Sequence, residues 1–205
     1  VLVEDRLFAT LDPRARRVSL GQDVTAVMTD TVGFIRKLPH DLVAPFKSTL
    51  EEAVDADLVL HVVDVAHPAW EEHLRVGDEV LEGLGVDRGR ELIVLNKIDL
   101  VAGRRPFAPG GRQAVAVSAA TGEGLGDLRS GIRGSLLSGP GVAILRIPLE
   151  EAELVQRAVN LPHQLARRFR HETVELAMRV DAWRLSEGGL DEYRVTDWGQ
   201  ADGGQ

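Results

Sequence analysis

The sequence contains no cysteine among its 205 residues, which excludes disulfide bonds and thiolate metal sites. This absence fits a reducing compartment, and we expect a cytoplasmic protein. Long apolar runs are also absent, because the longest, from Leu58 to Val63, is interrupted by His61 and is far too short to span a bilayer. No signal peptide is visible, but the first residue is Val1 rather than Met, so we expect an upstream segment to be missing from the sequence.

Positive charge is in the minority, with 24 Lys and Arg residues against 32 Asp and Glu residues and a net charge of −8. This balance argues against a dedicated non-specific nucleic-acid binder, and we expect no sequence-specific DNA binding. Two groups of arginines are candidates for local basic patches, and we interpret both as solvated faces of the fold. They are Arg14, Arg16 and Arg17, and Arg167, Arg168 and Arg170.

The rest of the composition, 44% hydrophobic and 27% charged, is typical of a globular domain with, at this length, room for a small appendage. Short apolar strands alternate with helical stretches, which predicts an α/β sheet. Strands are expected at 16–20 and 24–29, paired as an antiparallel hairpin, and at 58–64, 92–95 and 113–117. Helices are expected at 41–54, 68–84 and 125–137, with a loop at 102–112.

Residues 138–141, Ser-Gly-Pro-Gly, are the best candidate for a linker. A small βαβ-like appendage is expected beyond them, from a strand at 142–148, a helix at 150–159 and a strand at 174–183 whose apolar and polar residues alternate. The predicted domains are therefore 1–138 and 142–196. A polar, glycine-rich tail at 197–205 is predicted to be disordered.

Asn96, Lys97, Ile98 and Asp99 directly follow the apolar strand around 92–95, and ligands bind at the carboxyl ends of strands in open α/β sheets. The Asp99 carboxylate can accept hydrogen bonds from both N1–H and the 2-amino group of guanine. Adenine does not offer this pair of donors, so it would leave a buried carboxylate unpaired. Asn96 can bond a neighbouring loop and the base, and the stem of Lys97 can lie across the ring. This motif predicts guanine recognition.

Ser118, Ala119 and Ala120 follow the next apolar strand, at 115–117. A turn of small residues lets backbone N–H groups approach the guanine O6. Such turns are common, and this one is informative because it comes one strand after the N-K-x-D motif.

Asp30, Thr31, Val32 and Gly33 follow the strand expected at 24–29. The Asp30 carboxylate can reach Mg²⁺ through water, and the N–H of Gly33 can approach a γ-phosphate closely because glycine lacks a Cβ.

A segment closer to the N-terminus can also bind the γ-phosphate and Mg²⁺. There, the hydroxyl of Thr10 can bind Mg²⁺ and its N–H can bind the γ-phosphate, so the segment would order with GTP and loosen after hydrolysis. The segment consists of Phe8, Ala9, Thr10, Leu11 and Asp12. Together the four motifs, in this order, predict a protein that binds GTP and GDP with Mg²⁺ held by Thr10 and Asp30.

With these motifs the chain resembles the HflX family of ribosome-associated GTPases. The run Phe34-Ile35-Arg36-Lys37-Leu38-Pro39-His40 after D-x-x-G carries the resemblance more specifically than the GTPase motifs do, and it is supported by the stretches 1–13, 41–43, 48–52, 61–64 and 95–100. The resemblance covers residues 1 to 137 well. It implies a cytoplasmic GTPase that binds the large ribosomal subunit, with a P-loop-GTPase-like, mostly parallel sheet, flanking helices and a short C-terminal α/β domain.

Two departures qualify this expectation. No G-x-x-x-x-G-K-[ST] phosphate-binding loop occurs in the sequence, and the family places that loop and its central strand just upstream of Val1. We therefore expect an incomplete sheet with an unpaired gap, and weak nucleotide affinity for this chain alone. In addition, Phe34 stands where many GTPases carry a water-orienting Gln, so hydrolysis would need another group or the ribosome to place the water.

Two other functions remain as alternatives. The chain could be a nucleotide-free module that contacts the ribosome or RNA through its C-terminal domain and the arginines at 167, 168 and 170. A metal or hydrolytic site could also form from His61, His67 and His73 near Asp64, but their spacing of six residues matches no zinc pattern.

Overall fold

The strands form two separate sheets in the computed structural model, which describes residues 14–30, 53–101 and 106–198. The chain divides into two compact units, one of Val1–Arg17 with Val27–Gly131 and the other of Val18–Ala26 with Ile132–Gln205. We refer to them as the first and the second unit and describe each by itself. The predicted domain boundaries at 138 and 142 stay a prediction.

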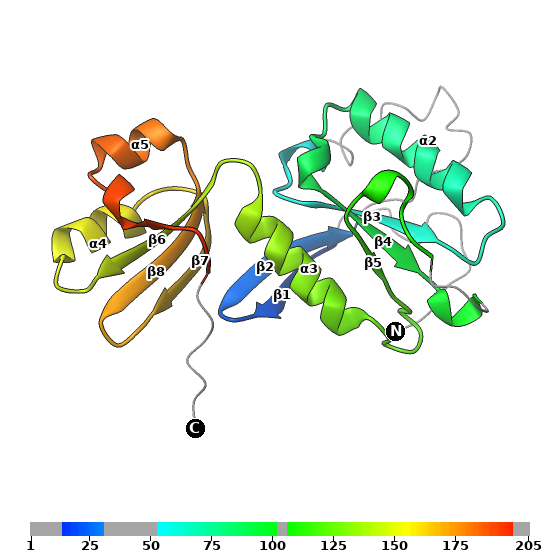
Figure 1. Cartoon of the computed structure of the whole chain (residues 1–205), viewed down its shortest axis with the longest axis horizontal. Helices are drawn as coiled ribbons and strands as arrows, with labels where there is room; N and C mark the ends of the chain where they lie inside the picture. Colours follow the sequence, from blue (N-terminus) through cyan, green and yellow to red (C-terminus); the bar gives the residue numbers. More distant parts are fainter. Residues whose placement is uncertain (1–13, 31–52, 102–105, 199–205) are drawn as a thin grey trace. The chain divides into compact units, whose positions relative to one another are not determined.

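The first unit contains a three-stranded parallel sheet of order β3-β4-β5 (Figure 1). Its strands are β3 (Val59–Asp64), β4 (Glu91–Asn96) and β5 (Ala114–Ala116). In β4 four consecutive residues, Leu92 to Leu95, are buried, as expected for a parallel strand covered on both faces. The α/β class predicted from the alternation of strands and helices is confirmed.

Helix α2 (Trp70–Gly83) connects β3 to β4 and packs on β3 (Figure 1). It begins after Pro68 and is followed by Gly85, whose φ of +79° is the left-handed conformation that commonly ends helices. Its buried side is formed by Leu74, Gly77 and Leu81, spaced by about one turn each. The helix predicted at 68–84 is confirmed to within two residues.

Helix α3 (Leu125–Ser138) is the helix predicted at 125–137. Among the described residues between β3 and α3, short 3₁₀ turns occur at Arg88–Arg90, Ile98–Leu100 and Pro109–Gly111. Of the helix predicted at 41–54, residues 53–55 are helical and the rest lie outside the described residues.

The six-stranded sheet has the order β1-β2-β7-β8-β6-β9. Its strands are β1 (Arg14–Gly21), β2 (Val24–Asp30), β6 (Val142–Pro148), β7 (Gln164–Phe169), β8 (Thr173–Arg179) and β9 (Arg194–Val195). Helices α4 (Ala152–Val159) and α5 (Ala182–Glu187) and the 3₁₀ turn Asp191–Tyr193 accompany it (Figure 1). The pairs β7-β8, β8-β6 and β6-β9 are antiparallel.

The βαβ-like arrangement expected for the appendage is therefore wrong in detail, although the region is α/β. Strand β7 was not expected, because Arg167 and Arg168 interrupt the apolar pattern that would indicate a strand. The strand predicted at 174–183 ends at Arg179, and Trp183 belongs to helix α5. Leu145, Leu176 and Leu185 are fully buried in the core that joins the sheet to α4 and α5.

The opposite face of β8 is polar but not exposed. Glu175 is only 3% exposed and accepts hydrogen bonds from Arg146 and Arg168, at 2.8 and 2.5 Å. The interpretation of the arginines at 167, 168 and 170 as a solvated face is wrong for Arg168, which is buried because β7 pairs it directly with Glu175. The side chain of Arg167 does remain exposed.

Strands β1 and β2 form the predicted hairpin, and Gln22 and Asp23 in its turn both have positive φ, as tight hairpin turns require. Of the described strands, β2 pairs with β7 through Val24 and Ala166 rather than with the β3-β4-β5 sheet. The unpaired gap expected in the parallel sheet stays a prediction. Within the second unit, the Trp198 indole N–H donates to the carbonyl of Gln22, at 3.1 Å.

None of the described helices is both long and apolar enough to cross a bilayer.

Candidate guanine-binding site

The loops that follow β4 and β5 lie next to each other because the two strands are parallel neighbours, with Leu95 opposite Ala116. Asn96 ends β4, and Lys97 adopts the left-handed conformation with φ 68° and ψ 35°. This sharp change of direction starts the 3₁₀ turn that carries Asp99. The N-K-x-D motif therefore lies at the carboxyl edge of the sheet, where ligands of open α/β sheets bind.

The side chain of Asn96 joins the two loops. Its Oδ1 accepts hydrogen bonds from the N–H of Lys97 at 2.8 Å and from the N–H of Ala119 at 3.1 Å. The N–H of Ile98 also donates to the carbonyl of Val117, at 3.2 Å. The bond from Asn96 to a neighbouring loop, expected from the sequence, is present, and it holds Lys97 and Ala119 in one arrangement.

The turn after β5 is organised by Ser118, which is fully buried. Its hydroxyl accepts from the N–H of Thr121 at 3.1 Å, and its carbonyl accepts from the N–H of Gly122 at 2.9 Å. Gly124 has a φ of +75°, and a Cβ there would overlap the carbonyl of Ala116. Ser118 thus shapes the loop through its own contacts, while Ala119 and Ala120 are exposed at its surface.

A neighbour of Lys97 was missed by the sequence analysis. Its ammonium Nζ lies 2.7 Å from Oδ2 of Asp64, the last residue of β3. The position of Asp64 at the end of a buried strand next to β4 is the signal that could have identified it.

The residues proposed to bind phosphate and Mg²⁺ lie mostly outside the described part of the chain. The residues outside the described part are Phe8, Ala9, Thr10, Leu11, Asp12, Thr31, Val32 and Gly33. Asp30 is described, as the exposed last residue of β2. Strand β2 belongs to the six-stranded sheet and β4 to the three-stranded one. That Asp99 and Gly33 bind the base and the γ-phosphate of one nucleotide therefore stays a prediction.

The histidines considered as metal ligands do not form one site. His67 and His73 have ring centroids 4.4 Å apart, and the Nδ1 of His67 accepts from the N–H of Ala69. The Asp64 carboxylate is paired with Lys97. His61 is buried on β3 and lies in a different group of polar residues.

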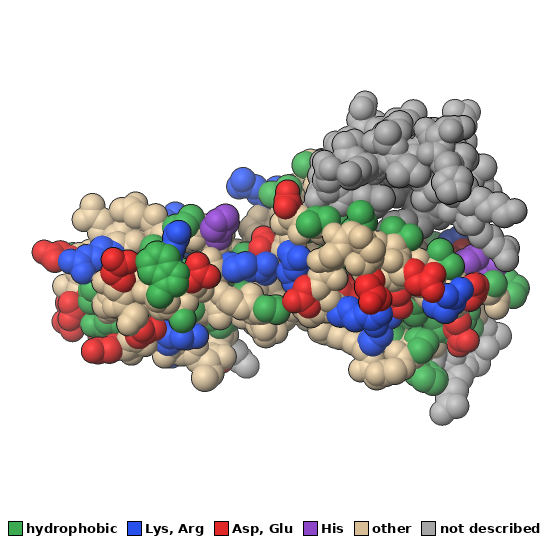
Figure 2. All heavy atoms as spheres, turned by 90° about the horizontal axis from the view of Figure 1, so that it is seen from above, with side chains coloured by type: hydrophobic (Ala, Val, Ile, Leu, Met, Phe, Trp, Pro, Cys, Tyr) green, Lys and Arg blue, Asp and Glu red, His purple; other side chains and the backbone are tan. Residues whose placement is uncertain are grey.

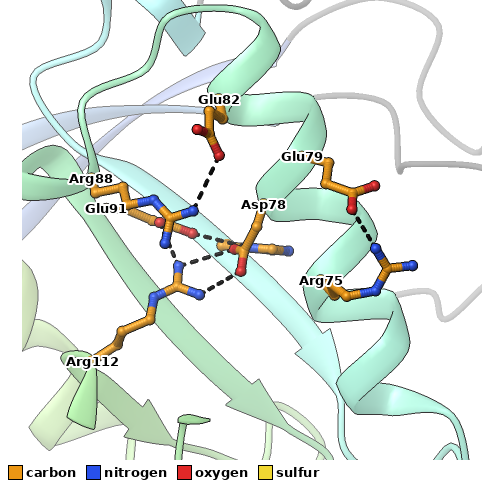
Figure 3. Close-up of polar contacts among 8 residues, drawn as sticks. Arg75, Asp78, Glu79, Glu82, Arg88, Glu91 and Arg112 are labelled. Atoms are coloured by element: carbon orange, nitrogen blue, oxygen red, sulfur yellow. Dashed lines mark hydrogen bonds and ion pairs between the residues drawn. The ribbon is translucent and has the colours of Figure 1, made fainter. Parts of the chain in front are cut away.

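That group, the His61 cluster, consists of His61, Asp78, Glu91 and Arg112 and joins β3, α2, β4 and the segment before β5 (Figure 3). The Nδ1 of His61 lies 2.9 Å from Oε1 of Glu91. Arg112 donates to Oδ2 of Asp78 and to Oε2 of Glu91, at 2.6 Å each. Within the described residues, His61, Asp78 and Glu91 offer ligand atoms within 4.8 Å of one another, but the guanidinium already occupies both carboxylates, so we interpret the cluster as an ion-pair network.

The neighbouring groups in the His61 cluster lower the pKa of Glu91. Burial raises the pKa of Glu91, but the hydrogen bond with His61 and the positive charge of Arg112 lower it more, so the net pKa lies below its ordinary value of 4.5. Glu91 therefore stays ionised at neutral pH and can accept hydrogen bonds from both His61 and Arg112.

Comparisons with known proteins agree with the guanine motifs. A family model described as 50S ribosome-binding GTPase matches residues 1–97. The chain is 48% identical over 150 residues to the GTPase HflX of Magnetococcus marinus, covering 71% of this chain and 33% of that protein. It is 35% identical over 206 residues to the GTPase HflX of Escherichia coli K12, covering 95% and 48%. The chain thus spans about a third to a half of the length of these relatives.

Among solved structures, the chain is similar to a GTP-binding protein from the archaeon Sulfolobus solfataricus in complex with GDP. The sequence identity is 27% and the TM-score is 0.52, over 60% of this chain and 44% of the other. The structure of that protein contains GDP, a guanine nucleotide.

Proposed function

The chain belongs to the HflX family of GTPases, and from this premise we propose that it binds GTP and GDP through a guanine site at the carboxyl ends of β4 and β5. The observation that carries the proposal is the bridge from Asn96 Oδ1 to the N–H groups of Lys97 and Ala119, which holds both candidate base-binding loops together. A site of this kind has its polar groups in place before the ligand arrives, which reduces the cost of binding.

Each loop has a defined role in this site. The Asp99 carboxylate accepts hydrogen bonds from N1–H and the 2-amino group of guanine. The stem of Lys97 lies along the ring plane, and the backbone N–H of Ala120 provides a donor for O6. The N–H groups of Ser118 and Ala119 shape the loop instead, since they donate to the carbonyl of Glu123 and to Oδ1 of Asn96. The carboxylate expected to be buried is exposed in this structure, so Asp99 would lose water only when a base covers it. A covering base that lacks the two donors would then leave Asp99 without partners, which disfavours that base.

The phosphates are assigned to residues 8–12 and 30–33, with Thr10 and Asp30 holding Mg²⁺. A hydroxyl and a carboxylate oxygen are ligands that suit this cation, and the Asp30 residue is exposed. When bound, Mg²⁺ neutralises charge on the β- and γ-phosphate oxygens. Since the 205 residues contain no phosphate-binding loop, we expect this chain by itself to bind nucleotides weakly and to hydrolyse GTP poorly.

Action on the large ribosomal subunit, in the cytoplasm, is the second part of the proposal, and family membership motivates it. The measurement is co-sedimentation with purified large subunits, with and without GTP. Failure of the chain to co-sediment under either condition would contradict this part.

A second candidate function is contact with RNA through β7 alone, without nucleotide. Phe169 is 62% exposed, and the guanidinium of Arg167 lies 6.0 Å from the centre of its ring, an arrangement that suits stacking on unpaired bases. On the face shown in Figure 2, however, acidic and basic side chains of the described residues are interspersed. Arg167→Ala with Phe169→Ala should weaken co-sedimentation if this candidate holds, while Arg157→Ala on α4 serves as a control for lost charge.

Nucleosides provide the sharpest test of the guanine site, because they do not need a phosphate-binding loop. We expect saturation-transfer NMR to show that the chain binds guanosine more tightly than adenosine. Asp99→Asn should reverse the preference between guanosine and xanthosine, because an amide can donate to the 2-carbonyl of xanthine and accept from its N1–H. Asp127→Asn, an exposed change on α3, is the matched control. An unchanged preference in Asp99→Asn would refute the assigned role.

A further inference from the structure

Asp64 and Asn96 occupy equivalent places at the carboxyl ends of neighbouring strands. They are the last register partners of the parallel β3-β4 ladder. The ladder continues beyond them, because the N–H of Val65 donates to the carbonyl of Asn96 at 3.0 Å. The side chain of Asp64 therefore originates from a fixed backbone position beside the N-K-x-D motif.

Both carboxylate oxygens of Asp64 have partners. Oδ1 accepts from the N–H of Ala66 at 3.0 Å, and Oδ2 lies 2.7 Å from the Nζ of Lys97. The backbone contact sets the orientation of the carboxylate, so the second oxygen is presented to Lys97 in one direction. Burial raises the pKa of Asp64, but the hydrogen bonds from Lys97 and Ala66 lower it by more. The net pKa lies below its ordinary value, so the carboxylate is charged at neutral pH.

Lys97 is thereby held at both ends of its side chain. Its backbone is bound to Asn96 and fixed in the left-handed conformation, and its ammonium is bound to Asp64. The four-carbon stem between these two points has limited freedom. An unrestrained lysine side chain populates many rotamers, so a stem that is already restrained loses less conformational entropy when a ligand binds along it.

We propose that Asp64 is a positioning residue for guanine binding: it anchors the ammonium of Lys97 so that the stem lies ready along the base. The inference rests on the proposed guanine site. The pair is half-exposed, with 51% of the Lys97 side chain and 40% of the Asp64 side chain accessible, so a base can reach the stem. Asp64 touches Lys97 and not the ligand, so its effect on binding passes through Lys97.

The experiment is a double-mutant cycle of Asp64→Asn and Lys97→Met on the full chain, read by guanosine titration in saturation-transfer NMR. Methionine keeps an unbranched apolar stem without the charge, so residual binding remains measurable. We expect Asp64→Asn alone to weaken guanosine binding about twofold to fivefold, the size of a half-exposed ion pair. In the Lys97→Met background the same change should have no effect. Glu72→Gln breaks another exposed ion pair, with Arg75, and should leave binding unchanged.

A second measurement does not need the ligand. The chain has only three lysines, Lys37, Lys47 and Lys97, so a spectrum of ¹³C-labelled lysine Cε groups can be assigned by single substitutions. Asp64→Asn should lower the order parameter of the Lys97 Cε group, and Glu72→Gln should not.

The outcomes separate this inference from the guanine site itself. If guanosine binds, Asp99→Asn reverses the base preference and Asp64→Asn has no effect or tightens binding, the positioning role is refuted and the site stands. If Asp64→Asn weakens binding equally with and without Lys97, Asp64 acts by another route and the inference is also refuted. If the wild-type chain shows no preference for guanosine over adenosine, both the site and the positioning role are refuted.

Discussion

Replacement of Gly77 by alanine tests the packing of α2 on β3 and with it the His61 cluster. Gly77 lies on the buried side of α2, and a Cβ there would lie 2.5 Å from Cε1 of His61 and closer still to Nε2. Carbon atoms pack comfortably at about 3.5–4.0 Å, so the imidazole would have to move by about 1 Å. The His61 ring cannot move that far and keep its 2.9 Å contact with Glu91.

The expected change in the free energy of unfolding caused by Gly77→Ala is the sum of opposing effects. In a helix interior, alanine is more favourable than glycine by about 1 kcal/mol. Overpacking of a filled site costs about 1–3 kcal/mol, and the loss of a hydrogen bond to a buried carboxylate costs about 1–3 kcal/mol more. We therefore expect Gly77→Ala to lower the free energy of unfolding by about 2 kcal/mol, opposite in sign to the helix propensity.

Gly83 provides the matched control, because it is in the same helix and a Cβ there would meet nothing within 4 Å. Gly83→Ala should be neutral or stabilising by up to about 1 kcal/mol. The measurement is urea unfolding of both variants, followed by circular dichroism. In a background with His61→Ala the penalty of Gly77→Ala should largely disappear, because the clashing ring is gone. Equal stabilities for Gly77→Ala and Gly83→Ala would refute the described packing.

Two further predictions concern ion pairs and the hairpin. Arg112→Met should lower the free energy of unfolding by about 3 kcal/mol in urea titrations, because it leaves the carboxylates of Asp78 and Glu91 without their cation. Since the pKa of folded Glu91 lies below 4.5, its stabilising contribution is present above that pH and is lost as the pH falls through the lower folded value, and Glu91→Gln should reduce this acid loss. Trp198→Ala should speed amide exchange in the β1-β2 turn, since the indole donates to Gln22, whereas Trp183→Ala, at an exposed site, should not.

Much of the first unit follows from local pattern. The apolar run from Leu92 to Leu95 predicts a buried strand, and Pro68 and Gly85 mark the two ends of a helix because of what each does to the backbone. The same local order placed Asn96 and Asp99 after one strand and Ser118 after the next, and the structure brings both loops to one edge of the sheet.

The contacts made by charged side chains could not be predicted in this way. His61 meets Glu91 and Asp64 meets Lys97 only because two parallel strands separated by a helix pair in one particular register. The local sequence suggests a surface position for Arg168, but the pairing of β7 with β8 places it against Glu175. Nothing in the local sequence of β2 indicates that its partner is β7.

The sequence by itself therefore determined the class of the fold, most of its elements and the residues of the guanine motifs. These depend on periodicity, on turn chemistry and on spacing along the chain, which are local properties. Only the tertiary structure decided which charges are buried in pairs, which sheet receives the hairpin and which residue holds Lys97. Such choices depend on strand register and on competition between partners distant in sequence, and free energies of that kind are set by the whole fold.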